Sequence, residues 1–264
     1  MLTFLIFGDV VGKIGREAVI KSLPDLKAKY RPDLVIANVE NIAHGVGVNL
    51  ASVSSLAKAG VDVFTSGNHI FQNKGVFDVW ADPELGSRLL RPDNFPGGTQ
   101  GSGSKSLEIG GKKVLVVNLI GQVFMDQEYA SPFEAFDRVL KENPGHDVIL
   151  VDFHGEATSE RVAFGLWADG RATAVWGTHT HVPTADARIL PQGTAYLTDV
   201  GMVGARLSVL GVEPKGPISR FTNAVPTKFN MPESGPADLN ALVVRVDPAL
   251  HRAQSIELVQ MIVE

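Results

Sequence analysis

The sequence predicts an α/β protein that forms one domain over residues 1–264, and three observations support this prediction. Short runs rich in Val, Ile, Leu and Phe recur along the chain, and they are continuous rather than alternating, which is typical of strands buried on both faces. Helical patterns lie between the first three runs. A chain of 264 residues with 44% hydrophobic and 20% charged residues is long enough to bury a large core, and no composition shift marks a domain boundary.

The elements follow in chain order. The expected buried strands are Leu2–Phe7, Leu34–Ala37, Val61–Thr65, Val148–Phe153 and Ala172–Trp176. The expected helices are Arg16–Tyr30, Leu50–Ala59, Pro132–Glu142 and Ser159–Ala168. Asn49 is placed to cap the second helix, and a proline in the first turn suits the third. The chain therefore begins as a β-α-β-α-β unit.

Other segments predict antiparallel strands. Gly110 and Gly111 separate two strand-like halves of Leu107–Val116, which is a strong hairpin signal. The runs Leu242–Val246 and Ser255–Ile262 predict a closing pair of edge strands. The stretch 201–236 is rich in proline and glycine, and we expect an ordered excursion that serves as a lid, an interface or both.

Composition excludes several classes of function. With 24 basic and 29 acidic residues the net charge is −5. The chain therefore lacks the excess of positive charge that binds duplex nucleic acid or an anionic membrane. The absence of cysteine excludes disulfides, thiolate nucleophiles, zinc fingers and iron–sulfur clusters. Asp9 interrupts the apolar opening run long before the roughly 20 residues of a membrane span, so we expect a buried strand and a cytoplasmic protein.

Side chains that can bind metals follow nearly every predicted strand. The carboxyl ends of strands in an α/β sheet form the ligand crevice, so residues at these ends converge. One histidine there is more often structural than functional, but the set is large. It comprises Asp9, Glu40, Asn68, His69, His154, His179 and His181. The sequence therefore predicts a metal site made of His, carboxylate and Asn ligands.

The loop after the first strand is similar to two other known motifs, and in each case a residue that the motif requires is missing. Gly8–Ile14 is similar to a phosphate-binding P-loop, but its glycines are four apart and Ile14 stands where a Ser or Thr would hold magnesium. Gly8-Asp9 is also similar to the start of Gly-Asp-Ser hydrolases. Val10 occupies the position of the nucleophilic serine, which excludes that acyl-transfer chemistry.

The blocks together resemble the calcineurin-like metallophosphoesterase superfamily, whose order is D-x-H, G-D, G-N-H, H and G-H-x-H. Within it the chain is similar to the YmdB-like branch of bacterial phosphodiesterases over Leu2–Asp199. Two positions depart from the superfamily pattern, because Val11 replaces a histidine and Glu40 stands where aspartate is usual. The blocks that carry the resemblance are Gly8-Asp9, Asn38–Asn41, Gly67–His69, His154–Glu160 and Gly177–Asp186.

The resemblance implies a two-sheet metallophosphoesterase sandwich flanked by helices, in α/β/β/α order, with two metal ions. Glu40 would bridge the ions, and His69 would be the general acid. One ion would be held by Asp9, His181 and Asn41, and the other by Asn68, His154 and His179. Mixed nitrogen and oxygen ligands suit iron, manganese or zinc better than magnesium. The family favours iron or manganese.

Several further residues have two open interpretations. Thr178, Thr180 and Glu156 either orient ligating imidazoles or bond within loops. His44 either meets substrate or is an exposed loop residue, and His146 and His251 are expected on the surface. The cations of the excursion either attract phosphate or are solvated; they are Arg206, Lys215, Arg220 and Lys228.

The expected function is hydrolysis of small phosphodiesters, such as 2′,3′-cyclic nucleotides, by a metal-activated water with His69 as acid. The alternatives are a phosphomonoesterase, a metal-dependent hydrolase of another bond, and a metal-binding regulatory protein with little turnover. A regulatory protein has no need of His69. The ligand blocks Asn38–Asn49, Thr65–Gln72 and Trp176–Asp186 contain no Lys or Arg, which favours diesters over the more highly charged monoesters. Homo-oligomerisation stays open.

Overall fold

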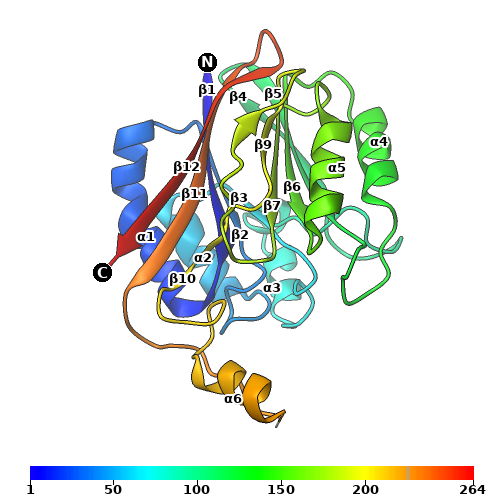
Figure 1. Cartoon of the computed structure of the whole chain (residues 1–264). Helices are drawn as coiled ribbons and strands as arrows, with labels where there is room; N and C mark the ends of the chain where they lie inside the picture. Colours follow the sequence, from blue (N-terminus) through cyan, green and yellow to red (C-terminus); the bar gives the residue numbers. More distant parts are fainter. Residues whose placement is uncertain (225) are drawn as a thin grey trace.

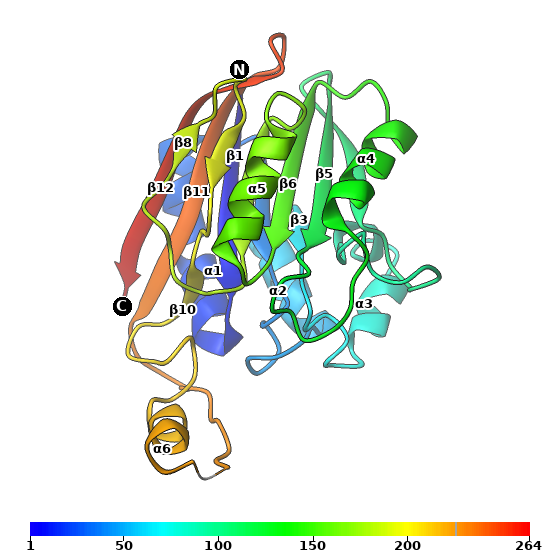
Figure 2. The same cartoon turned by 45° about the vertical axis from the view of Figure 1, so that its right-hand side comes forward.

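Two six-stranded sheets pack face to face in the computed structural model, which describes residues 1–224 and 226–264. Helices cover both outer faces (Figure 1; Figure 2). This is the α/β/β/α sandwich implied by the sequence resemblance. No helix within these described ranges is both long and apolar enough to cross a membrane.

The first sheet has the order β12-β11-β10-β1-β2-β3. Its strands β1, β2, β3 and β10 are parallel, whereas β11 is antiparallel to both β1 and β12. The bounds are β1 Leu2–Val10, β2 Leu34–Asn38, β3 Val63–Thr65, β10 Met202–Ala205, β11 Ala237–Asp247 and β12 Arg252–Val263.

The second sheet has the order β4-β5-β6-β7-β9-β8. Strands β5, β6, β7 and β9 are parallel, and β4 and β8 close the two edges as antiparallel strands. The bounds are β4 Ser104–Ile109, β5 Lys112–Ile120, β6 Val148–His154, β7 Ala174–Thr178, β8 Arg188–Ile189 and β9 Ala195–Leu197.

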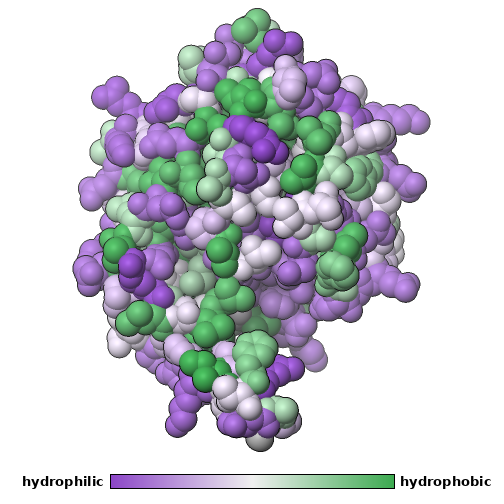
Figure 3. All heavy atoms as spheres, viewed as in Figure 1, coloured by the Kyte–Doolittle hydropathy of each residue, from purple (hydrophilic) through white to green (hydrophobic). Residues whose placement is uncertain are grey.

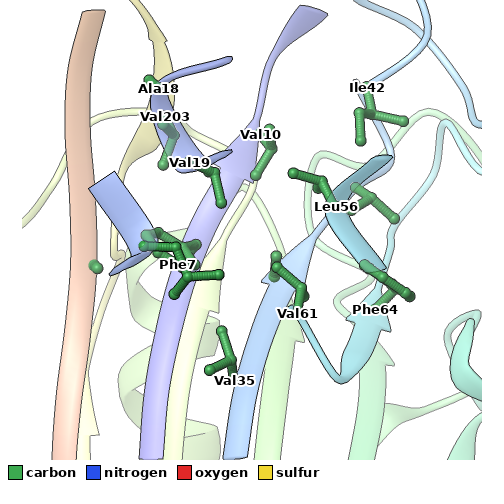
Figure 4. Close-up of a cluster of buried hydrophobic side chains, with 14 of the residues drawn as sticks. Phe7, Val10, Ala18, Val19, Val35, Ile42, Leu56, Val61, Phe64 and Val203 are labelled. Atoms are coloured by element: carbon green, nitrogen blue, oxygen red, sulfur yellow. The ribbon is translucent and has the colours of Figure 1, made fainter. Parts of the chain in front are cut away.

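Three apolar layers hold the sandwich together. The first lies between the first sheet and helices α1 (Gly12–Tyr30), α2 (Leu50–Ala59) and α3 (Val76–Ala81). In Figure 4, Ala18 and Val19 lie beside strand residues of this layer, among them Phe7. The second layer fills the space between the sheets. The third packs the second sheet against α4 (Pro132–Glu142) and α5 (Thr158–Ala168).

Most predicted elements are confirmed, including α2 and α4 with the expected bounds. The Asn49 side chain accepts a hydrogen bond from the Ser52 amide, as a helix cap does. Both turn glycines of the β4–β5 hairpin have positive φ, 57° at Gly110 and 73° at Gly111, which explains why glycine stands there. The chain also forms α3, β8, β9 and β10 and a 3₁₀ turn at Gly86–Arg88, none of which was predicted.

The closing strands differ from the prediction. We expected two edge strands, but only β12 is an edge, since β11 pairs with β12 on one side and with β1 and β10 on the other. Leu239, Ala241 and Val243 face the helix layer, whereas Leu242 and Val244 face the other sheet. Burial on both faces is the pattern of an interior strand.

The excursion begins later than residue 201. Strand β10 lies inside the first sheet between β1 and β11, so the start of this stretch belongs to the core. The rest carries helix α6 (Lys215–Asn223), which projects from the lower end of the molecule in Figures 1 and 2. Hydrophobic side chains gather on that end in Figure 3, where Ile218 and Phe221 of α6 are exposed.

Candidate metal centre

The predicted metal-binding side chains all lie at one end of the sandwich, where β1, β2, β3, β6 and β7 end. Asp9 is near the end of β1, and His154 is the last residue of β6. The others lie in the loops that follow β2, β3 and β7, and they are Glu40, Asn41, Asn68, His69, His179 and His181. This is the lower end in Figure 1, the same end from which α6 projects. Parallel strands thus bring together residues that are far apart in the sequence.

Four potential ligand atoms meet around His154. Its Nε2 atom is 3.1 Å from Asn68 Oδ1, 3.1 Å from His179 Nδ1 and 3.2 Å from Glu40 Oε1. Glu40 and His154 are fully buried in the described structure. Two imidazole nitrogens, one carboxylate oxygen and one amide oxygen form a donor set that suits a transition metal.

A second group of side chains shares Glu40 with the first. His181 Nε2 is 4.0 Å from Asp9 Oδ1 and 3.2 Å from the Asn41 side-chain nitrogen. That Asn41 nitrogen is 3.4 Å from Glu40 Oε1. Asp9 Oδ1 is buried without a hydrogen-bond partner among the described residues. A buried carboxylate oxygen without a partner is costly, so this oxygen fits a cation that would complete the group.

The charges of the first group depend on one another. Burial opposes ionisation of Glu40, but the charge of His154 and its hydrogen bond hold the pKa of Glu40 below its ordinary value. Burial also opposes the charge on His154, yet Glu40 raises the pKa of His154 to about 9. Burial, aided by the charge of His154, lowers the pKa of His179 to about 3. At pH 7 the metal-free site therefore holds a proton on His154 beside an ionised Glu40.

We expect metal uptake to displace this proton. A histidine must be deprotonated to bind a metal ion, so the proton on His154 competes with the metal below pH 9. The affinity for Mn²⁺ should therefore rise with pH, by about tenfold per unit between pH 6.5 and 8. Calorimetric titration in two buffers of different ionisation enthalpy measures both the affinity and the proton released. An affinity that does not change over this range would contradict the charge state given to His154.

The loop after β7 has an unusual backbone. His179 and His181 both have positive φ, 108° and 65°, a backbone conformation that residues other than glycine rarely adopt. Asp199 holds the loop, because its Oδ2 accepts hydrogen bonds from the Thr180 amide (3.2 Å) and hydroxyl (2.7 Å). Buried Arg161 pairs with the same Asp199 oxygen at 2.6 Å. The loop is thus fixed in the form that turns both imidazoles into the site.

Two of the three proposed orienting residues contact an imidazole. The Thr178 hydroxyl is 2.9 Å from His154 Nδ1 and donates to Asp152 at 2.7 Å, so it accepts from a protonated Nδ1 and leaves Nε2 for a ligand. Glu156 Oε2 lies 3.1 Å from His179 Nε2. Thr180 takes the other of its two open interpretations, because its hydroxyl donates to Asp199 and so bonds within the loop region.

His69 lies at the rim of the centre with a side chain that is 34% exposed. Its backbone amide donates to Glu40 Oε2 at 2.9 Å, which ties the turn after β3 to the buried carboxylate. Its Nδ1 atom is 2.8 Å from Asn41 Oδ1. An amide oxygen accepts, so His69 carries a proton on Nδ1 and its Nε2 is left for another partner.

The other sequence candidates lie apart from the two groups. His44 is exposed in the loop after β2, near Lys13 and Arg16. Within the excursion, Arg206 pairs with Asp238 at 2.7 Å and Arg220 lies over the ring of Phe229. Lys215 begins α6, and Lys228 follows that helix.

The two remaining histidines lie at the opposite end of the sheet. His146 precedes β6 and bonds the Ser106 hydroxyl at 2.7 Å, and it is half-buried rather than fully on the surface. His251 is exposed in the β11–β12 turn, as expected.

Sequence reasoning missed the buried polar residues behind the ligands. Asp152 bonds the hydroxyls of Thr65 and Thr178, and Asp199 anchors the loop that bears His179 and His181. Asp152 stands two residues before His154 in an otherwise apolar strand, so it points to the same face. A single carboxylate two residues before a candidate ligand in an apolar strand was the signal that could have identified Asp152.

The chain is similar to known proteins in sequence and in fold. The YmdB-like protein family model matches residues 5–259. A 2′,3′-cyclic-nucleotide 2′-phosphodiesterase of Bacillus subtilis is 43% identical over 97% of this chain and 96% of its own. A crystal structure of a phosphatase from Mycoplasma pneumoniae is 36% identical with a TM-score of 0.91, covering 99% of this chain and 93% of that one.

More distant structures share the fold alone. The 5′-nucleotidase precursor of Thermus thermophilus is 13% identical and superposes with a TM-score of 0.54, over 98% of this chain and 54% of the nucleotidase chain. The two-sheet sandwich is therefore a fold that this chain shares with the 5′-nucleotidase precursor.

Proposed function

Since this chain belongs to the YmdB-like family and is a phosphoesterase, we propose that it hydrolyses small phosphodiesters and that 2′,3′-cyclic nucleotides are its substrates. The observation that carries the proposal is the meeting of ligand atoms around His154 and Glu40, with an unpartnered Asp9 oxygen on one side and His69 at the rim. The activity of the relative from Bacillus subtilis supports the choice of substrate.

The residues present fit two metal ions, and iron or manganese suits their mixed nitrogen and oxygen donors. Glu40 would contribute to both ions. Asn68, His154 and His179 would hold one, and Asp9, Asn41 and His181 would hold the other. Two divalent ions in such a site polarise phosphoryl oxygens and lower the pKa of a bound water.

The chain's own side chains provide the proton for the leaving group. A protonated His69 donates through Nδ1 to the Asn41 oxygen, which leaves its Nε2–H for the substrate. When the phosphorus–oxygen bond to the leaving group breaks, that proton passes from Nε2 to the departing oxygen. Asn41 holds the ring in this orientation, and the bond from the His69 amide to Glu40 fixes the turn.

A comparison of diesters with monoesters tests the proposal. A monoester carries up to two charges, and a site that prefers it usually adds a fixed cation. The ligand loops contain no Lys or Arg, and in the excursion Arg206 is paired with Asp238. We therefore expect kcat/KM to be higher for a 2′,3′-cyclic nucleotide than for the matching 2′- and 3′-monophosphates under one metal. A preference for the monophosphates would establish a phosphomonoesterase, and no turnover of either would leave a metal-binding regulatory role.

A further inference from the structure

A group of aromatic rings lies beside the candidate centre. Phe71 is its middle member, with ring centroids 6.1 Å from Phe77, 5.6 Å from Trp80 and 5.9 Å from Phe95. Phe95 in turn stacks on Tyr129 at 5.0 Å with planes 10° apart. We call Phe71, Phe77, Trp80, Phe95 and Tyr129 the aromatic platform. Its rings come from three separate parts of the chain.

The aromatic platform is joined to the centre through the turn that bears Phe71. Phe71 belongs to the turn after β3 that also carries Asn68 and His69, and the Gln72 amide closes this turn on the His69 carbonyl at 2.9 Å. Tyr129 is nearly buried at the other end. Burial and the nearby Asp126 raise its pKa.

Two rings of the aromatic platform are exposed to solvent, and the others are held in place by the protein. Phe71 is 37% exposed and Phe77 is 43% exposed, whereas the other rings are buried or half-buried. The Trp80 indole donates to the Leu89 carbonyl, so the ring beneath Phe71 is fixed. A partly exposed ring that lies two residues after His69 and packs on an anchored indole suits a flat aromatic ligand, because stacked rings gain more than their buried area alone provides.

We propose that Phe71 is the surface on which the base of a nucleotide substrate stacks while its phosphate lies at the metal centre. This inference rests on the proposed function and deepens it. Stacking is tolerant of sequence because every base has a π face, so the site should accept all four bases with a modest preference for purines. Phe71 would then be a binding residue that distinguishes nucleotides from phosphodiesters without a base.

The main rival for the base is a cavity of about 470 Å³ beside His181. Its polar side chains bond to one another or to the backbone: Asn240 donates to the Met202 carbonyl at 2.7 Å, and Gln260 donates to Asn240 at 3.1 Å. Arg206 there is paired with Asp238. His181 is a candidate metal ligand, and no Phe, Tyr or Trp lines this cavity within the described part of the chain, so it offers a base less than Phe71 does.

Kinetics of Phe71→Leu test the inference. The substrates are adenosine 2′,3′-cyclic phosphate and methyl riboside 2′,3′-cyclic phosphate, which has the same ring and phosphate but no base. We expect KM for the nucleotide to rise about 10- to 100-fold with little change in kcat, and KM for the base-free substrate to stay the same. Phe71→Trp should keep the wild-type KM. Trp167→Leu is the matched control, because Trp167 is 49% exposed on α5, outside the aromatic platform.

Other outcomes separate this inference from the proposed function. Equal losses on both substrates, or no change for the nucleotide, would overturn the role of Phe71. A rise in KM with Leu210→Ala instead, in the lining of the rival cavity, would move the base to that cavity. Absence of turnover on every cyclic nucleotide would overturn the proposed function, and binding would then decide the role of Phe71.

Tryptophan fluorescence provides that binding measurement. Trp80 lies against Phe71, so a base stacked on Phe71 should change its emission, and Trp167→Phe removes an exposed emitter. With manganese-loaded protein we expect saturable quenching by adenosine 2′,3′-cyclic phosphate and none by the methyl riboside. Phe71→Leu should raise the midpoint about 10- to 100-fold. Quenching that is unchanged in Phe71→Leu would overturn the inference.

Discussion

Glu40→Gln will lower the metal content of the protein from about two ions per chain to less than one. Glu40 is buried and its Oε1 atom lies 3.2 Å from His154 and 3.4 Å from the Asn41 nitrogen, so one carboxylate serves both groups of ligands. The glutamine keeps the shape but removes the charge that attracts both ions. We expect kcat/KM on cyclic nucleotides to fall by more than about 100-fold, since even the loss of a group behind the ligands costs 10- to 100-fold.

Elemental analysis of protein purified without chelators measures this effect. Glu257→Gln is the control, because it makes the same change on β12, where the carboxylate accepts from Tyr30. If active wild-type protein contains no more than one ion, Glu40 does not bridge two. If Glu40→Gln loses one ion and retains the other, the carboxylate belongs to a single site.

His69→Ala will separate proton donation from metal binding. Its bond to Glu40 comes from the backbone amide, so alanine keeps that contact while it removes the imidazole. Metal content and thermal stability should therefore stay near those of the wild type. Turnover of 2′,3′-cyclic nucleotides should fall by about 10²- to 10⁴-fold, as loss of a general acid typically does.

The leaving group provides the decisive comparison for His69→Ala. Nitrophenyl phosphodiesters have leaving groups that hardly need a proton, so the loss should be much smaller for them. His251→Ala, at the far end of the molecule, serves as the control. Loss of metal, or an equal loss on good and poor leaving groups, would show that His69 does not act as the acid.

The candidate ligands were predictable because each lies at or just after the end of a strand, and parallel strands end together. A buried apolar run that stops at His, Asp or Asn gives a local signal, as at His154. The residues behind the ligands have no such signal. Asp199 follows β9, a strand of only three residues, and its role depends on contacts with Thr180 and Arg161 that are formed only in the folded chain.

The same reasoning explains the errors in the fold. Helix α3 has six residues and β8 has two, which is too short for a periodic pattern to emerge. The position of β11 could not be read from its own sequence, because pairing with β1 is a contact between the two ends of the domain. Periodicity reports which faces are buried but not which neighbour buries them.

The interior place of β11 has a consequence for how the centre assembles. β1, which carries Asp9, pairs with β11 along Leu2–Phe7 and with β10 at its end. These contacts join the first strand to a distant part of the chain, and contacts of such high sequence separation slow folding. We therefore expect the strand that bears Asp9 to gain its partner β11 only after β11 has been synthesised, so the candidate centre should form late in folding.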